Sequence, residues 1–182
     1  MNTETIDLIC PNCGYHLGQQ DLFRAYERKV AEWLDGEVCA ALNPNFDVWK
    51  CAEFPSLTFQ VKFANIYHYS GKARRHRQAS WPFNQHTMDS GKPDYFVLFG
   101  VTDEGQEHCF LLRRDVFITH SSPNSTGGRI MLMTPNQFSR RGGRGKSYVH
   151  ENKVWKYEVK NPEVNLVQRV QDYESFKQEQ LF

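Results

Sequence analysis

The segment 57–63 reads Leu57-Thr58-Phe59-Gln60-Val61-Lys62-Phe63, and from Thr58 onward polar and apolar side chains alternate along it. Successive side chains of a β-strand point to opposite faces, so the pattern predicts a strand with one face on a hydrophobic core. The other face then carries Gln60 and Lys62 together. Any half-buried strand shows this alternation, so the function has to be sought in the residues around it.

Two carboxylates precede this predicted strand. Glu37 lies near the end of a helical pattern, and Asp47 lies in the short apolar run Phe46-Asp47-Val48-Trp49. A divalent metal can be held between such carboxylates and a carbonyl oxygen, with an ammonium group beside it. This combination suits phosphodiester hydrolysis, which requires an activated water and positive charge near the phosphate.

The order of these parts resembles the PD-(D/E)xK nucleases, which share the restriction-endonuclease-like fold. In that comparison the helix carboxylate, the metal-binding Asp, the middle ligand and the catalytic lysine correspond to Glu37, Asp47, Gln60 and Lys62. The chain departs from the family pattern at Phe46, where the family has Pro, and at position 60, where Gln stands as in some members. The resemblance covers roughly residues 21–120.

The resemblance implies a fold, a cofactor and a set of roles. The fold is α/β, a restriction-endonuclease-like core whose mixed central sheet is flanked by helices. Mg²⁺ would be held by Asp47, by the side-chain carbonyl of Gln60 and by the main-chain carbonyl of Val61, with Glu37 as a further carboxylate. Lys62 would help to deprotonate or orient the attacking water and would stabilise charge at the phosphate.

A helix is predicted from Asp21 to about Leu42, because apolar residues recur at spacings of three and four. Gly36 interrupts the pattern, which then continues through Glu37 and stops at Asn43-Pro44-Asn45. Two other carboxylates of this helix compete with Glu37 for a role in the site, namely Glu27 and Glu32. The alternative for Glu37 is a solvated residue at the end of the helix.

Further elements are predicted downstream. Residues 93–101 and 107–112 form two strands joined by a hairpin turn at 103–105, and Asp94 is interpreted as a strand-entry residue. Residues 121–128 are predicted to be a loop, residues 131–133 a short strand and residues 154–159 another strand. Residues 161–182 predict an amphipathic terminal helix, which packs on the core or contacts a second subunit. Residues 21–182 thus form one nuclease-like domain behind a short cysteine-containing segment, residues 1–20.

The N-terminal segment carries Cys10-Pro11-Asn12-Cys13-Gly14, in which both sulfurs can reach one Zn²⁺. A structural zinc site needs four ligands, and the available partners are His16, Cys39 and Cys51. The alternatives are a pair of unligated thiols and half of a site completed across a dimer. No secretory signal is evident, and no apolar run approaches the ~20 residues that cross a membrane, so a cytoplasmic location is expected.

Positive charge is local in this chain, since the formal net charge is only +1. Two basic stretches, each expected to be a loop, are predicted to contact DNA phosphates, and the glycines of the second would allow a close backbone approach. The alternative is a pair of solvated surface loops. The residues concerned are Lys72, Arg74, Arg75 and Arg77 in the first stretch, and Arg140, Arg141, Arg144 and Lys146 in the second. Trp81-Pro82-Phe83-Asn84 is expected to anchor the first stretch on the core.

The sequence therefore predicts a Mg²⁺-dependent endonuclease acting on double-stranded DNA, a sequence-specific enzyme of the type II restriction kind. A homodimer is expected, because cutting two strands requires two active sites. The alternatives are a homing or repair nuclease of the same fold and a nucleic-acid-binding protein without catalysis. An enzyme with a Cys or His nucleophile is disfavoured, because no cysteine is evidently paired with a histidine.

Overall fold

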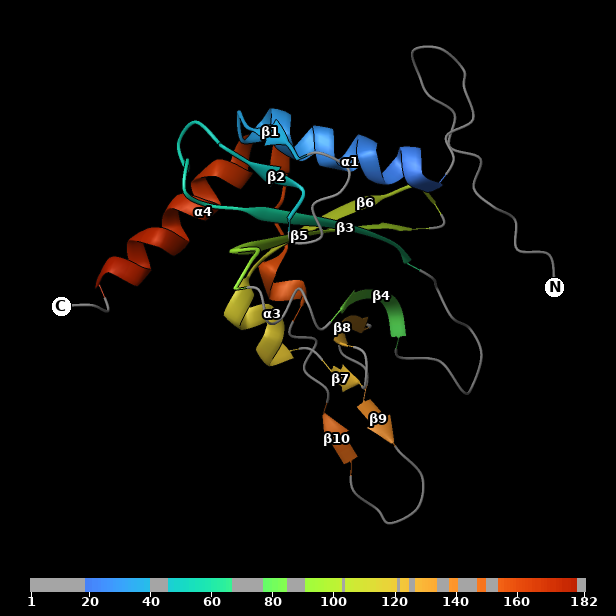
Figure 1. The fold of residues 1–182 in the computed structure, drawn as a ribbon. Helices are drawn as coiled ribbons and strands as arrows, with labels where there is room; N and C mark the ends of the chain where they lie inside the picture. The colour runs from blue at the N-terminus through green and yellow to red at the C-terminus, as the bar shows by residue number, and fades with distance from the viewer. Residues whose placement is uncertain are drawn as a thin grey trace.

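The structure is a computed structural model, and it describes residues 19–39, 46–66, 77–84, 91–102, 104–120, 122–124, 127–133, 138–140, 147–149 and 154–179. Its centre is a mixed five-stranded sheet in the order β1-β2-β3-β5-β6 (Figure 1). The strands are β1 (Glu37–Val38), β2 (Val48–Trp49), β3 (Phe59–Ile66), β5 (Tyr95–Thr102) and β6 (Glu107–Arg113). Strands β3 and β5 run parallel, and the other neighbours are antiparallel.

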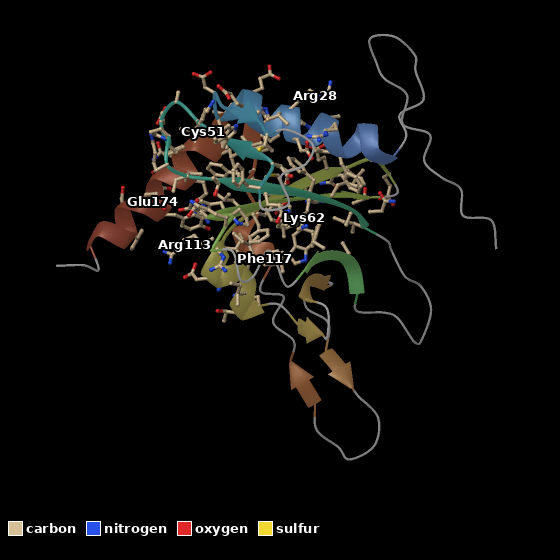
Figure 2. All side chains as sticks on the ribbon, viewed as in Figure 1. Arg28, Cys51, Lys62, Arg113, Phe117 and Glu174 are labelled. Carbon is tan, nitrogen blue, oxygen red and sulfur yellow. The ribbon has the colours of Figure 1, made fainter. Side chains whose placement is uncertain are left out.

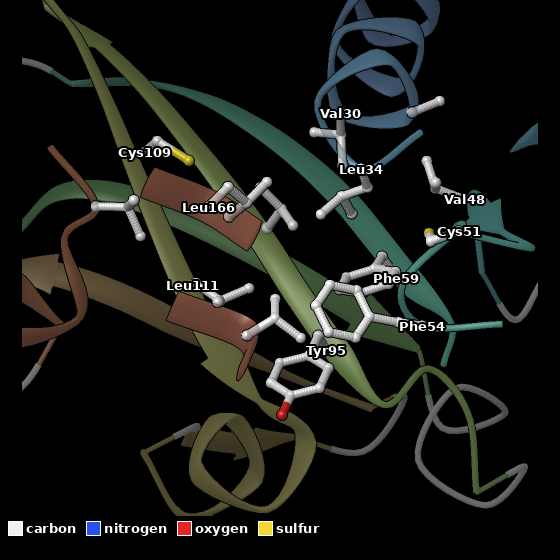
Figure 3. Packing of buried hydrophobic residues seen from close by; sticks show 14 of the residues in the cluster. Val30, Leu34, Val48, Cys51, Phe54, Phe59, Tyr95, Cys109, Leu111 and Leu166 are labelled. Carbon is white, nitrogen blue, oxygen red and sulfur yellow. The ribbon is translucent and has the colours of Figure 1, made fainter. Parts of the chain in front are cut away.

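Two helices cover one face of this sheet, α1 (Gln19–Trp33) and α4 (Pro162–Glu179). Figure 3 shows the core between them, where Val30 of α1, Leu34 just after α1 and Leu166 of α4 lie near Phe59 and Leu111 of the sheet. All five of these side chains are at most 2% exposed. Burial of a Leu, Val or Phe side chain stabilises a fold by about 1.5–3 kcal/mol, so this layer holds the helices to the strands.

The opposite face of the sheet packs against α3 (Arg114–His120) and strand β4 (Arg77–Asn84). Phe117 of α3 stacks on Phe96 of β5, with 3.8 Å between the ring centroids. Trp81 of β4 is fully buried, and its Nε1 donates to the carbonyl oxygen of Phe99 at 2.9 Å. The predicted anchor at Trp81 is therefore confirmed, although it belongs to a strand.

Smaller elements complete the described fold. Strand β4 pairs with β8 (Gly127–Met133), which pairs with β7 (Ser122–Asn124), in a second sheet. Strands β9 (Phe138–Arg140) and β10 (Ser147–Val149) form a two-stranded ribbon, and the 3₁₀ helix η1 (Trp155–Tyr157) precedes α4. The mixed α/β class with helices on both faces of the central sheet agrees with the predicted class. Residues 1–18, including Cys10 and Cys13, lie outside the described part.

The predicted continuation of the first helix to Leu42 is wrong, because α1 ends at Trp33 and Glu37 lies in strand β1. Asp35 adopts a φ of 46°, and the amide of Gly36 donates to the carbonyl of Ala31 at 2.8 Å, which closes the helix. A Cβ at Gly36 would lie 2.9 Å from Cys51 Sγ, so any larger residue here would force the neighbouring segment at Trp49 and Cys51 to shift. A contact distant in sequence therefore ends the helix.

Two other sequence predictions need correction. Residues 154–159 do not form a strand: η1 occupies Trp155–Tyr157, and only Glu158 bridges to Phe110 of β6. The alternation of apolar residues there arises because Val154 and Trp155 pack on the core beside Phe110, while Val159 joins the other face. The predicted loop 121–128 contains strand β7.

Candidate active site

Asp47 lies at the point where β2 begins to pair with β3. Its amide donates to the carbonyl of Phe59 at 2.9 Å, and its Oδ2 accepts from the amide of Val61 at 2.7 Å. The pairing between β2 and β3 stops at Val48 opposite Phe59, so the carboxylate replaces the next main-chain partner of β3. Asp47 is thereby fixed beside the open edge of β3, and its other carboxylate oxygen accepts no hydrogen bond from the described residues.

Two oxygen atoms of β3 accompany this carboxylate. The amide and carbonyl of one strand residue point to the same side, so the Val61 carbonyl faces the edge to which Asp47 bonds. The Oε1 atom of Gln60 is buried, and no described residue donates a hydrogen bond to it. A buried oxygen without a partner costs about 1–3 kcal/mol, and such an atom calls for a compensating ligand.

Lys62 follows two residues later, on the same face of β3 as Gln60, because side chains on that face recur with period two. Figure 2 shows Lys62 at the side of the sheet that faces β4. Burial lowers the pKa of its ammonium group, and the negative charge of Asp47 partly restores that pKa. In the part of the chain that the structure describes, Lys62 forms no ion pair with a carboxylate. The structure thus brings Asp47 and Lys62 within electrostatic reach of each other and places Gln60 on the same face of β3 as Lys62, while their role as a catalytic group stays a prediction.

The predicted fourth member, Glu37, is not brought to this group. Its side chain is 59% exposed and pairs with Lys50, the Lys50 Nζ lying 2.9 Å from Glu37 Oε2. The helix carboxylate that acts electrostatically on Asp47 is that of Glu27, whose negative charge raises the pKa of Asp47. Glu27 is only 12% exposed and pairs with Arg24 at 2.6 Å.

A sequence signal for Glu27 exists. It lies four residues after Phe23 and three before Val30, so it occupies a position in the apolar stripe of α1. A charged residue at a core-facing position of a helix is rarely placed there without a partner or a ligand. Glu37 lacks this signal, since it follows the break at Gly36.

The electrostatics of the group centre on Asp47, whose pKa is raised to about 6. Burial is the main cause, and the charge of Glu27 adds to it. The hydrogen bond from the Val61 amide and the charges of Lys62 and Arg24 act in the opposite direction but do not compensate. Near neutral pH the carboxylate is therefore a desolvated anion that a divalent cation would stabilise.

The donor set fits a hard cation. Asp47 supplies a carboxylate oxygen, Gln60 an unpartnered amide oxygen and Val61 a carbonyl oxygen, with Glu27 nearby. Mg²⁺ prefers oxygen ligands and is commonly bound by one or two carboxylates together with waters and substrate phosphates. Three or more His, Cys, Asp or Glu side chains suited to a metal are not grouped anywhere among the described residues. The proposed site relies instead on the amide and main-chain oxygens.

The other predicted site residues are only partly described. Cys51, one candidate zinc partner, is fully buried in the core beside α1, where burial raises the pKa of its thiol to about 11. Arg77 opens β4 and Arg140 ends β9. The remaining basic residues, Lys72, Arg74, Arg75, Arg141, Arg144 and Lys146, lie outside the described ranges, as do Cys10, Cys13 and His16.

Comparisons with known proteins give no assignment: a scan of known families finds no match to the chain, and a search of curated proteins finds none either. None of the described helices has the length and apolar character needed to span a membrane.

Proposed function

We propose that this protein is a Mg²⁺-dependent DNA endonuclease with a restriction-endonuclease-like core. The observation that carries the proposal concerns three side chains around the start of β3: Asp47 at its edge, and Gln60 and Lys62 on one face. Among the described residues, Gln60 Oε1 has no hydrogen-bond partner and the Lys62 ammonium pairs with no carboxylate. The order of elements supports it, because α1, the antiparallel strands β1 to β3 and the parallel strand β5 follow one another as the family resemblance requires.

In this proposal Asp47, Gln60, the Val61 carbonyl and Glu27 hold the metal, and Glu27 takes the role that the sequence assigned to Glu37. The chemistry that Mg²⁺ supplies when bound is Lewis-acid polarisation of the phosphate and activation of a water molecule. Lys62 orients the attacking water and stabilises the negative charge that builds up on the phosphate oxygens. Its low-dielectric surroundings strengthen that stabilisation, since the ammonium is partly desolvated before the substrate arrives.

The substrate we propose is double-stranded DNA, cut at a specific sequence by a homodimer of the type II restriction kind. Two copies supply two active sites for the two strands of a two-fold-related site. The basic stretches around residues 72–77 and 140–146 would supply phosphate contacts, and a structural Zn²⁺ at Cys10 and Cys13 stays a prediction.

The test is cleavage of mixed plasmid and phage DNA with Mg²⁺, and with a chelator in place of Mg²⁺. The wild type is compared with Asp47→Ala and Lys62→Ala, and Lys50→Ala is the matched control for an exposed lysine near the same strands. Discrete fragments from the wild type and from Lys50→Ala alone, only with Mg²⁺, would support the proposal. DNA binding without cleavage by the wild type would instead favour a non-catalytic binding protein. Cleavage that survives both site substitutions would place the active site elsewhere.

A further inference from the structure

We propose that Arg24 is a built-in counter-cation that competes with the divalent metal for the carboxylate of Glu27. This inference rests on the proposed function. Arg24 Nη1 lies 2.6 Å from Glu27 Oε2, one helical turn away on α1. The Arg24 side chain is 34% exposed and that of Glu27 12% exposed, so the carboxylate is largely shielded from water and the guanidinium is partly exposed.

The ion pair keeps the site neutral when no metal is bound. Asp47 and Glu27 contribute two negative charges, and Lys62 and Arg24 contribute two positive ones. Each cation acts on Asp47 in the same direction, since the charges of both Lys62 and Arg24 lower its pKa. Without Arg24, two neighbouring carboxylates would repel each other in a poorly solvated place.

The same ion pair stands in the way of metal binding. Glu27 Oε2 accepts a charge-assisted hydrogen bond from Arg24, so a cation that binds this oxygen has to displace the guanidinium or share the carboxylate with it. In either case part of the metal's binding free energy is spent on weakening the ion pair. Arg24 keeps a second acceptor afterwards, because its Nη1 also lies 3.4 Å from the carbonyl oxygen of Cys39.

A merely structural role for Arg24 makes a different prediction. An ion pair between residues three apart stabilises a helix by about 0.2–0.5 kcal/mol, and losing it would lower stability equally with and without metal. If Arg24 competes with the metal for Glu27, the effect of removing Arg24 depends on whether the metal is present. Removing Arg24 then lowers stability in a chelator but raises the affinity for Mg²⁺ by about fivefold, which corresponds to an ion pair of about 1 kcal/mol.

The experiment measures Mg²⁺ binding itself, by calorimetric titration and by the rise in melting temperature on adding Mg²⁺. Arg24→Met is compared with Arg28→Met, which removes the same charge from the exposed side of the same helix (Figure 2). Arg24→Lys keeps the charge without the guanidinium fork, so its affinity is expected between those of the wild type and Arg24→Met. Arg24→Gln replaces Arg24→Met if the latter does not fold.

Tighter Mg²⁺ binding by Arg24→Met but not by Arg28→Met is the expected result, and adding Glu27→Gln to Arg24→Met abolishes the gain. Equal changes in the two arginine variants would show a general charge effect and overturn the inference. Weaker binding by Arg24→Met would overturn it too, because Arg24 would then help to build the site. If no form, including the wild type, binds Mg²⁺, the proposed function fails along with the inference. If the wild type binds and Arg24→Met matches it, only the inference fails.

Discussion

Two aspartates flank the start of β3, and their surroundings differ. Asp94, on the β5 side, accepts three hydrogen bonds at Oδ2: from the Thr58 amide at 2.8 Å, the Thr58 hydroxyl at 2.6 Å and the Lys92 ammonium at 3.0 Å. Asp47, on the β2 side, accepts one hydrogen bond from the described residues, donated by the Val61 amide at 2.7 Å. Burial raises the pKa of both carboxyl groups, but at Asp94 the hydrogen bonds and the Lys92 charge outweigh burial and bring its pKa below the usual value.

The contrast separates a structural carboxylate from a candidate functional one. Asp94 ties the start of β5 to the start of β3, and all of its partners come from the protein. Asp47 leaves an oxygen without a partner, in a place where Gln60 Oε1 also has none among the described residues. Groups whose environment opposes their charge cluster at functional sites, because a ligand completes what the protein leaves unsatisfied.

After the loss of Asp47 itself, the largest expected effect on cleavage is that of Gln60→Leu. The substitution removes a metal ligand, so we expect DNA cleavage to fall by about 100-fold, in the range typical for losing an electrostatic contact at a reacting centre. The folded state should be no less stable, because a buried oxygen without a partner disappears. Gln60→Glu, which keeps an oxygen donor, is the control and should still cut. Cleavage by Gln60→Leu at the wild-type rate would exclude Gln60 as a ligand.

The next effect concerns stability in the absence of metal. Asp94→Asn removes a charge from three hydrogen bonds, and we expect it to lower the free energy of unfolding by about 2 kcal/mol. Asp47→Asn removes a poorly compensated buried charge and keeps an acceptor for the Val61 amide, so it should leave stability unchanged or higher at pH 7.5. Urea unfolding in a chelator measures both variants. A larger loss for Asp47→Asn than for Asp94→Asn would contradict the contrast between the two aspartates.

A smaller effect separates the two glutamates. Glu27→Gln should reduce cleavage at subsaturating Mg²⁺ by about tenfold, the effect of losing roughly 1.4 kcal/mol of interaction with the metal. Glu37→Gln breaks only an exposed ion pair with Lys50 and should cut like the wild type. The rates are measured over a series of Mg²⁺ concentrations. A larger loss of cleavage in Glu37→Gln than in Glu27→Gln would contradict this prediction and favour Glu37 as the helix carboxylate of the site.

The last effect is the pH dependence of stability without metal. The Asp47 pKa is about 6 in the folded protein and about 3.9 in an unfolded chain, so stability should decline as pH rises from about 4 to about 6. The contribution of Asp94 to stability changes with pH in the opposite direction. Asp94 stabilises the fold above its unfolded pKa, and that contribution is lost as pH falls through its lowered folded pKa. Asp47→Asn should therefore remove a decline of about 2 kcal/mol between pH 4 and 6. Unfolding curves of the two variants at a series of pH values check this, and an unchanged slope in Asp47→Asn would contradict it.

The local pattern of β3 was sufficient to predict one part of the site. Period-two alternation placed Phe59, Val61 and Phe63 in the core under α1, and the structure confirms this. It also placed Gln60 and Lys62 on the opposite face. An Asp in a short apolar run indicated the strand that meets β3, because a charge there needs a reason.

The helix carboxylate could not be predicted in the same way. Gly36 signalled only a weak point in the helical pattern, whereas the actual end of α1 depends on Cys51 and Trp49, which pack against Gly36 from later in the chain. Because the chain turns there, Glu37 lies in strand β1 with an exposed side chain. Glu27 is instead the helix carboxylate whose charge acts on Asp47. Likewise, the alternation at 154–159 could not reveal that this segment touches β6 at one residue alone.

The most direct test of the central claim is single-turnover cleavage of DNA with Mg²⁺ by the wild type, Asp47→Asn and Asp94→Asn, each at a temperature where unfolding curves show it fully folded. The account predicts wild-type cleavage by Asp94→Asn and a loss of about 1,000-fold or more in Asp47→Asn, as expected when a ligand of the catalytic metal is lost. Equal activity of the two variants, or loss only in Asp94→Asn, would contradict it.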